Sequence, residues 1–217
     1  MDSKKKRLMI GILFLMIISI SAVVTYYWYN NTYYVSTEDS TVTADLVKAV
    51  PQMTGTLLEL NVKEGQFVEK GQIIARQDMG SLADTSQDLS IVRAPISGIV
   101  VKKQGTVGEI VSPSVTIATL VDPSDIYVTA NIEETKLENI KLEQEVDISI
   151  DKYDGEKFTG KVDSIGEAAN AVFSVLPTSS TGTFTKVTQK IPVKIKFDEV
   201  TTKLQPGLNA VIKIHVK

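Results

Sequence analysis

The sequence contains no cysteine and a single histidine, His215. The absence of cysteine excludes disulfide bonds, thiolate metal ligands and catalytic thiols. One histidine cannot form a multi-histidine metal site, and a serine–histidine–aspartate set could use only that residue. His215 alternates with Lys213 and Lys217 at the end of the chain, so we expect it to be a solvent-facing strand residue rather than a catalytic base.

An excess of one charge is also lacking, since the formal net charge is -3 over 217 residues. This balance does not favour nucleic-acid binding. The chain is 43% hydrophobic and 23% charged, which is typical of a globular protein. No constellation of side chains in the sequence would carry chemistry. We therefore expect a protein that is not an enzyme and that binds no metal or cofactor.

The first thirty residues hold the longest apolar run of the chain. A helix over residues 8–29 would be about 33 Å long at ~1.5 Å per residue, which matches the bilayer core. A basic cluster precedes this run and an aromatic cluster that includes Trp28 ends it, as is typical of the two membrane interfaces. The basic cluster, which predicts a cytoplasmic N-terminus, consists of Lys4, Lys5, Lys6 and Arg7.

A cleaved secretory signal is the alternative interpretation of this segment, with Ser19-Ile20-Ser21 as a cleavage site. The length of the run and the aromatic cluster beyond that site favour an uncleaved anchor. No second apolar run approaches ~18 residues, so the sequence predicts a single crossing. The bulk of the chain is then extracellular or periplasmic.

Two segments in the middle of the chain, 55–75 and 98–118, align without gaps at a constant spacing of 43 residues. Each copy predicts a strand, a glycine turn and a second strand, with positive φ at Gly65 and Gly108. One copy is too small to bury its apolar face, so two copies related by a pseudo-twofold axis would close a β sandwich. The identical pairs are Gly55/Gly98, Gly65/Gly108, Val68/Val111, Ile74/Ile117 and Ala75/Ala118.

This duplicated half-motif resembles the biotinyl/lipoyl fold. In carrier proteins of that fold, a lysine in the turn between the halves bears the cofactor. Here the connection 77–90 contains no lysine. The resemblance therefore implies the sandwich without the swinging arm.

The remainder of the chain predicts a small antiparallel β barrel. Apolar residues alternate with polar ones over 126–132, 146–150, 191–197 and 210–216. Asp154-Gly155 and Pro206-Gly207 are turn signals. Glu133–Ile140 predicts one or two helical turns, and residues 166–185 predict a strand fragment with a flexible turn at Thr178–Thr183.

Five short segments in order are similar to motifs of HlyD-type membrane fusion proteins (periplasmic adaptors), nearest the EmrA-like branch. They are 35–44, 50–55, 93–98, 183–195 and 204–208, and Arg93-Ala-Pro-Ile-Ser-Gly98 is the most specific of them. The family usually has glycine where Glu143 stands. The resemblance implies a mainly β protein with a transmembrane helix, a lipoyl-like barrel-sandwich hybrid and a β barrel. The expected divisions are 1–7 cytoplasmic tail, 8–29 membrane helix, 30–49 linker and first barrel strand, 50–121 lipoyl-like domain, and 122–217 barrel.

Adaptors of this family usually carry a long α-helical hairpin between the lipoyl halves. Here the connection 79–93 has 15 residues, so about seven residues in each direction reach at most ~25 Å. A coiled-coil arm is therefore absent, and docking onto an outer-membrane channel is not expected. The candidate contact residues at this tip are Met79, Gly80, Ser81, Leu82 and Asp84.

The function implied by the resemblance is that of a membrane-anchored accessory subunit of an efflux or secretion system. Its expected partner is a major-facilitator multidrug exporter, with an ABC exporter as the nearest rival. Ring or stacked self-assembly is usual in the family. Two interpretations of another class are a biotin or lipoate carrier, which the missing lysine disfavours, and a cell-surface structural protein.

Overall fold

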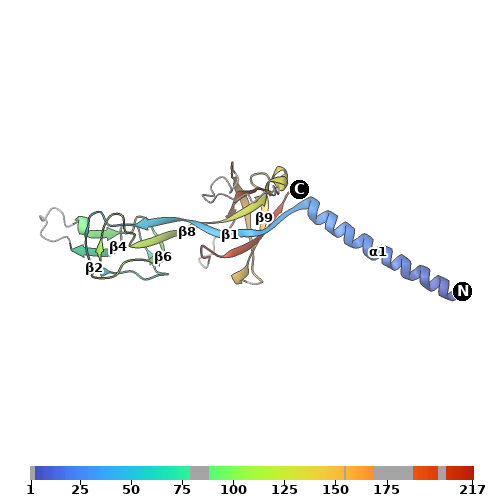
Figure 1. Ribbon diagram of the computed structural model, residues 1–217, viewed down its shortest axis with the longest axis horizontal. Coiled ribbons are helices and arrows are strands. Elements are labelled where there is room, and N and C mark those ends of the chain that lie inside the picture. The colour runs from blue at the N-terminus through green and yellow to red at the C-terminus, as the bar shows by residue number, and fades with distance from the viewer. Residues whose placement is uncertain (1–2, 79–87, 154, 169–187, 200–203) are drawn as a thin grey trace, which may run out of the picture. The chain divides into compact units, whose positions relative to one another are not determined.

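The computed structural model describes residues 3–78, 88–153, 155–168, 188–199 and 204–217, with the backbone alone over residues 3–10 (Figure 1). The expected tip residues 79–84 and the expected flexible turn at 178–183 lie outside the described residues. The chain divides into two compact units. One contains residues 1–40, 129–198 and 209–217, and the other contains residues 41–128 and 199–208.

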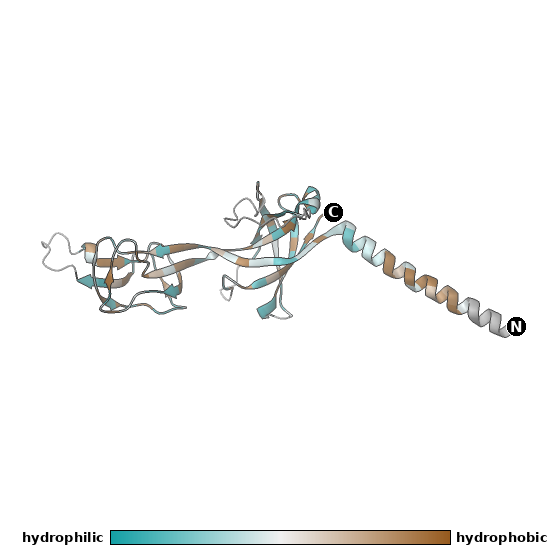
Figure 2. Ribbon diagram, in the orientation of Figure 1, coloured by the Kyte–Doolittle hydropathy of each residue, from teal (hydrophilic) through white to brown (hydrophobic). Residues whose placement is uncertain are grey.

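Helix α1 runs over Ser3–Tyr33 and carries the apolar run of the sequence. Its segment Gly11–Tyr33 contains an 18-residue window of mean hydropathy 1.9 and is long and apolar enough to cross a bilayer, as a signal sequence near an N-terminus would also be. Figure 2 shows hydrophobic residues over the middle turns of this helix and hydrophilic ones at its end next to the barrel. From Ile12 onward its large apolar side chains are exposed, which suits a surface facing lipid.

The first unit also holds a closed barrel of six strands in the order β1-β12-β9-β10-β11-β8, with β1 paired to β8. Alternation brings the predicted apolar residues inward, including Ile132, Ile148, Ile195 and Ile212, each at most 1% exposed. A 3-10 helix at Glu134–Asn139 confirms the predicted helical turns. The strands are β1 (Tyr34–Ala49), β8 (Ala118–Glu133), β9 (Glu145–Ile150), β10 (Lys157–Ile165), β11 (Lys190–Phe197) and β12 (Asn209–His215), with a second 3-10 turn at Asp151–Tyr153.

The second unit is the predicted sandwich. Its two layers are β5-β4-β2-β7 and the β8-β6-β3 part of the larger sheet. The core between them is formed by apolar side chains of both repeat copies, among them Leu57, Val100, Ile74 and Ile117. The strands are β2 (Gly55–Leu60), β3 (Phe67–Val68), β4 (Ile73–Asp78), β5 (Ile91–Arg93), β6 (Gly98–Lys103) and β7 (Ile110–Val111).

The internal repeat is present in the backbone hydrogen bonds as well as in the sequence. The Gly65 amide donates to the Val100 carbonyl at 2.8 Å, and the equivalent Gly108 amide donates to the Leu57 carbonyl at 2.7 Å. The return bonds from Val100 and Leu57 repeat in the same way. Even the bulges correspond, since register shifts occur at 57/59 and at 100/102. The pseudo-twofold prediction is confirmed.

The turn glycines of the two copies have the predicted conformation, with φ of +81° at Gly65 and +92° at Gly108. An added Cβ would meet no atom within 4 Å at either position. The backbone conformation, and not lack of space, is therefore what requires glycine at these turns. Gly98 differs, because a Cβ there would lie 2.3 Å from the Val121 carbonyl oxygen.

Glu143 occupies a turn where the family usually has glycine, and it adopts a φ of +65°. Its amide donates to the Val162 carbonyl at 2.9 Å, and the neighbouring Gln144 side chain accepts from the Lys141 amide. Among the residues that the structure describes, Glu143 is the sole non-glycine with positive φ. The turn is therefore kept, with a side chain in a conformation that L-residues disfavour.

Replacing this residue should stabilise the barrel. We expect Glu143→Gly to raise the free energy of unfolding by about 1 kcal/mol, because the left-handed conformation no longer strains a Cβ. The matched control is Glu145→Gly in strand β9, which should lower it by a similar ~0.5–1 kcal/mol. Urea denaturation of the detergent-solubilised chain measures both changes. A lower midpoint for Glu143→Gly would contradict the strain argument.

Candidate functional site

The described residues contain no group of three or more histidine, aspartate or glutamate side chains placed to hold a metal ion. His215 lies 2.9 Å by Nε2 from Asp147 Oδ2, and its ring packs edge-on against Tyr34. His215 was expected to face solvent on its strand; its side chain is 34% exposed and has two partners that the alternation did not indicate. Both contacts join the end of β12 to neighbouring strands, so they are structural.

The sequence-predicted site residues fall in two places. The tip residues Met79–Asp84 lie outside the described residues. The basic cluster Lys4–Arg7 lies in the first turns of α1, and Trp28 is 63% exposed near the other end of the helix. Trp28 is thus free to lie in a membrane interface.

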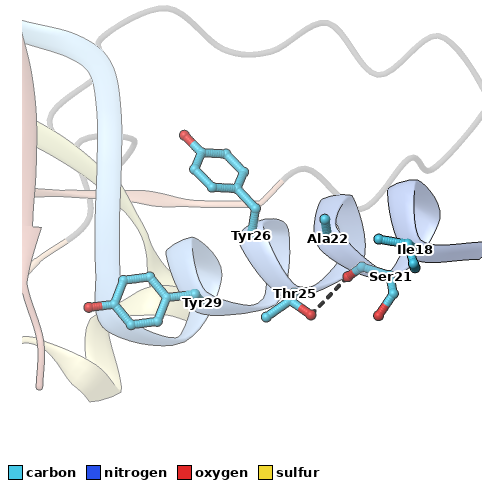
Figure 3. A pocket seen from close by; sticks show the side chains of 6 residues that line it. All are labelled: Ile18, Ser21, Ala22, Thr25, Tyr26 and Tyr29. Carbon is cyan, nitrogen blue, oxygen red and sulfur yellow. Dashed lines mark hydrogen bonds between the residues drawn. The ribbon is translucent and has the colours of Figure 1, made fainter. Parts of the chain in front are cut away.

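One face of α1 carries small side chains around an open hollow (Figure 3). Ser21, Ala22 and Thr25 are its small residues, bordered by Ile18 and aromatic side chains. The Thr25 hydroxyl donates to the Ser21 carbonyl at 2.8 Å, so it is satisfied within the helix. The spacing of three and four residues puts these side chains on one face, where a second helix could approach closely.

Exposed apolar side chains stand at outward positions of the sandwich, where the repeat makes Leu58 equivalent to Val101 and Phe67 equivalent to Ile110. We group them in two sets. The first, which we call patch 1, consists of Leu58, Val107 and Ile110, which are 53%, 59% and 71% exposed. The second, patch 2, consists of Phe67 and Val101, which are 55% and 36% exposed.

The charges beside the two patches are opposite. Glu59 follows Leu58 in patch 1, and the equivalent Lys102 follows Val101 in patch 2. Both are exposed. The two sets thus differ in charge at this equivalent position, where Glu59 also lies 4.0 Å from Arg76 of the same chain.

A polar cluster on the barrel is held by Asp39. Its carboxylate accepts from Lys190 Nζ at 2.7 Å and from Asn131 Nδ2 at 3.0 Å. These two hydrogen bonds lower the pKa of Asp39 from its usual value of 3.8. Because both side chains of the ion pair are about half exposed, the pair contributes little to stability at neutral pH.

Two domain families match this chain. Residues 45–122 match the barrel-sandwich hybrid domain of RND membrane fusion proteins. Residues 126–214 match the YknX-like beta-barrel domain. The first match covers the sandwich and the second covers most of the barrel strands.

The putative efflux system component YhbJ of Bacillus subtilis is 35% identical over 185 residues, which are 85% of this chain and 80% of that protein. The colistin resistance protein EmrA of Acinetobacter baumannii is 37% identical over 131 residues, or 59% of this chain. This chain spans 37% of that EmrA's length. The solved structure of the periplasmic adaptor protein EmrA has a similar fold, with a TM-score of 0.59 at 14% identity over 84% of this chain and 98% of that one.

Proposed function

The chain belongs to the family of membrane fusion proteins that serve as efflux adaptors, and we propose that it is the membrane-anchored adaptor of a multidrug exporter. It is not an enzyme. The observation that carries the proposal is the combination of an exposed, bilayer-length helix with a barrel and a sandwich in one chain. The relatives named for efflux and for drug resistance support the same function.

A major-facilitator exporter is the proposed partner, on the likeness to the EmrA branch. An ABC exporter is the alternative. The chain has one candidate membrane span within its described residues, which does not enclose a transport path. The exporter therefore supplies both the path and the energy, and this chain acts through binding. Purification of the complex from native membranes, followed by mass spectrometry, identifies which transporter class is bound.

The proposed topology places the N-terminus in the cytoplasm and both β units outside it. The basic residues at 4–7 and the aromatic residues at 26–29 support this orientation. We expect protease added to intact protoplasts or spheroplasts to digest the chain beyond residue 30. A cytoplasmic protein must remain intact as the control, and a C-terminus protected until lysis would contradict the topology.

The small-residue face of α1 is the proposed contact with the exporter in the bilayer. Helix association in lipid depends on close packing, because lipid tails are as apolar as the side chains they replace. A face of serine, alanine and threonine permits that approach, whereas the bulky side chains on the opposite side do not.

We expect the double variant Ala22→Leu/Thr25→Leu to reduce co-purification with the exporter and drug resistance at least fivefold, because the added side chains separate the helices. The matched control is Val23→Leu/Val24→Leu, which adds bulk at the same depth on another side and should change neither. Drug-resistance assays at equal expression measure the effect.

Replacing residues 80–88 with a Gly/Ser linker tests the other candidate surface, the sandwich tip. We expect that variant to retain both export and co-purification. If it is inactive while Ala22→Leu/Thr25→Leu is fully active, the exporter binds the tip and not the helix.

Self-association is the second proposed interaction, with patch 1 of one copy against patch 2 of the next. The exposure of Ile110 and Phe67 supports burial in an assembly, since large exposed apolar side chains in clusters mark interfaces. The opposite charges of Glu59 and Lys102 favour this head-to-tail pairing over pairing of like patches.

Charge exchange tests the pairing. We expect Glu59→Lys alone and Lys102→Glu alone to weaken self-association, because each places like charges across the contact. The double variant Glu59→Lys/Lys102→Glu should restore it. Light scattering in detergent at low salt, where surface charges are least screened, measures the assembly. If the double variant self-associates more weakly than both single variants, the head-to-tail arrangement is contradicted.

A further inference from the structure

The last turn of α1, the first residue of β1 and the end of β12 are joined by more than the peptide chain. Helix α1 ends at Tyr33 and β1 begins at Tyr34 without an intervening residue. The Val216 amide, just after β12, donates to the Tyr33 carbonyl at 3.0 Å. Carbonyls in the last turn of a helix lack an intrahelical partner, so this bond caps the helix.

Lys213 on β12 contacts both elements at once. Its Nζ lies 4.0 Å from the centroid of the Tyr34 ring and 3.4 Å from Oδ1 of Asn30 in the last turn of α1. An ammonium within about 6 Å of an aromatic face is attracted by the ring's electrons. A cation at a helix C-terminus is also favoured by the helix dipole.

His215 holds the same tyrosine from a second position. Its ring centroid is 4.9 Å from that of Tyr34, with an interplanar angle of 81°. Residues 213 and 215 share a face of β12, because side chains alternate along a strand. His215 is tied in turn to Asp147 on β9. Tyr34 is therefore fixed by two side chains of β12, one of which is anchored to the next strand.

We infer that Lys213 is a positioning residue that fixes the orientation of the membrane helix on the barrel, so that the helix and the barrel move as one body. A direct peptide connection alone would leave rotation about the backbone bonds of Tyr33 and Tyr34. The contacts of Asn30, Tyr33 and Tyr34 with β12 remove that rotation. Only the purpose of this rigid joint rests on the proposed function: when the exporter displaces the helix, the joint passes that displacement on to the barrel.

The absence of native cysteine permits a direct measurement of this rigidity. Nitroxide labels are placed at Val24→Cys in α1 and Thr159→Cys in β10, both exposed sites. Double electron–electron resonance on the full chain in lipid nanodiscs then gives the distribution of distances between them. We expect a narrow distribution that Lys213→Gln broadens at least twofold.

Two variants separate the role of Lys213 from a general loss of charge. Lys213→Arg should keep the narrow distribution, because a guanidinium also stacks on an aromatic ring. Lys196→Gln, which removes an exposed lysine of β11, should keep it as well. An insertion of Gly-Ser-Gly between Tyr33 and Tyr34 gives the reference for a loose joint.

The inference is overturned if the distance distribution of the unmodified chain is as broad as that of the insertion variant. It is also overturned if the distance distribution of the Lys213→Gln variant stays as narrow as that of the unmodified chain, since the other contacts would then be enough to fix the helix on the barrel. No exporter is present in the nanodiscs. The result is therefore independent of whether the chain serves as an adaptor.

Discussion

Each half of the sandwich completes the backbone hydrogen bonding of the other half, and the fold of that unit depends on this exchange. The turn at Gly65 donates to the strand that follows Gly98, and the turn at Gly108 donates to the strand that follows Gly55. Neither half could form these bonds alone, and the apolar core between the layers is also built from side chains of both halves. Folding of the unit therefore requires both copies, although they are separated by a connection and a spacing of 43 residues.

The same exchange separates the positions that must match from those that can differ. Inward pairs such as Val68/Val111 and Ile74/Ile117 are identical and fully buried, because both copies fill one core. Outward pairs carry no such constraint, and Glu59 stands where the other copy has Lys102. Internal symmetry thus constrains the inward side chains of the sandwich, while the outward side chains of the two copies can differ in charge.

Local patterns in the sequence predicted the elements, whereas contacts between distant residues could not be predicted from it. The length of the apolar run and its flanking residues identified the candidate membrane helix, and equal spacing identified the repeat with its turn glycines. The junction was missed, because Asn30 and Lys213 meet across 183 residues of chain. Alternation placed His215 on the polar face but could not reveal that Tyr34 and Asp147 lie against it. At Glu143 the residue type argued against a left-handed turn, and the hydrogen bonds around it override that preference.

A chain without catalytic chemistry can influence an exporter only by binding its conformations unequally. The strength of that influence depends on how completely a movement at one contact changes the position of another. A flexible tether between the helix and the barrel would let each bind independently, and the free energy of one contact would not reach the other. With a joint fixed by Lys213, Tyr34 and the Tyr33 carbonyl, any change in the orientation of the helix also changes the orientation of the barrel. The proposed contact of the helix with the exporter would then reach the barrel directly, which is what coupling between the two requires.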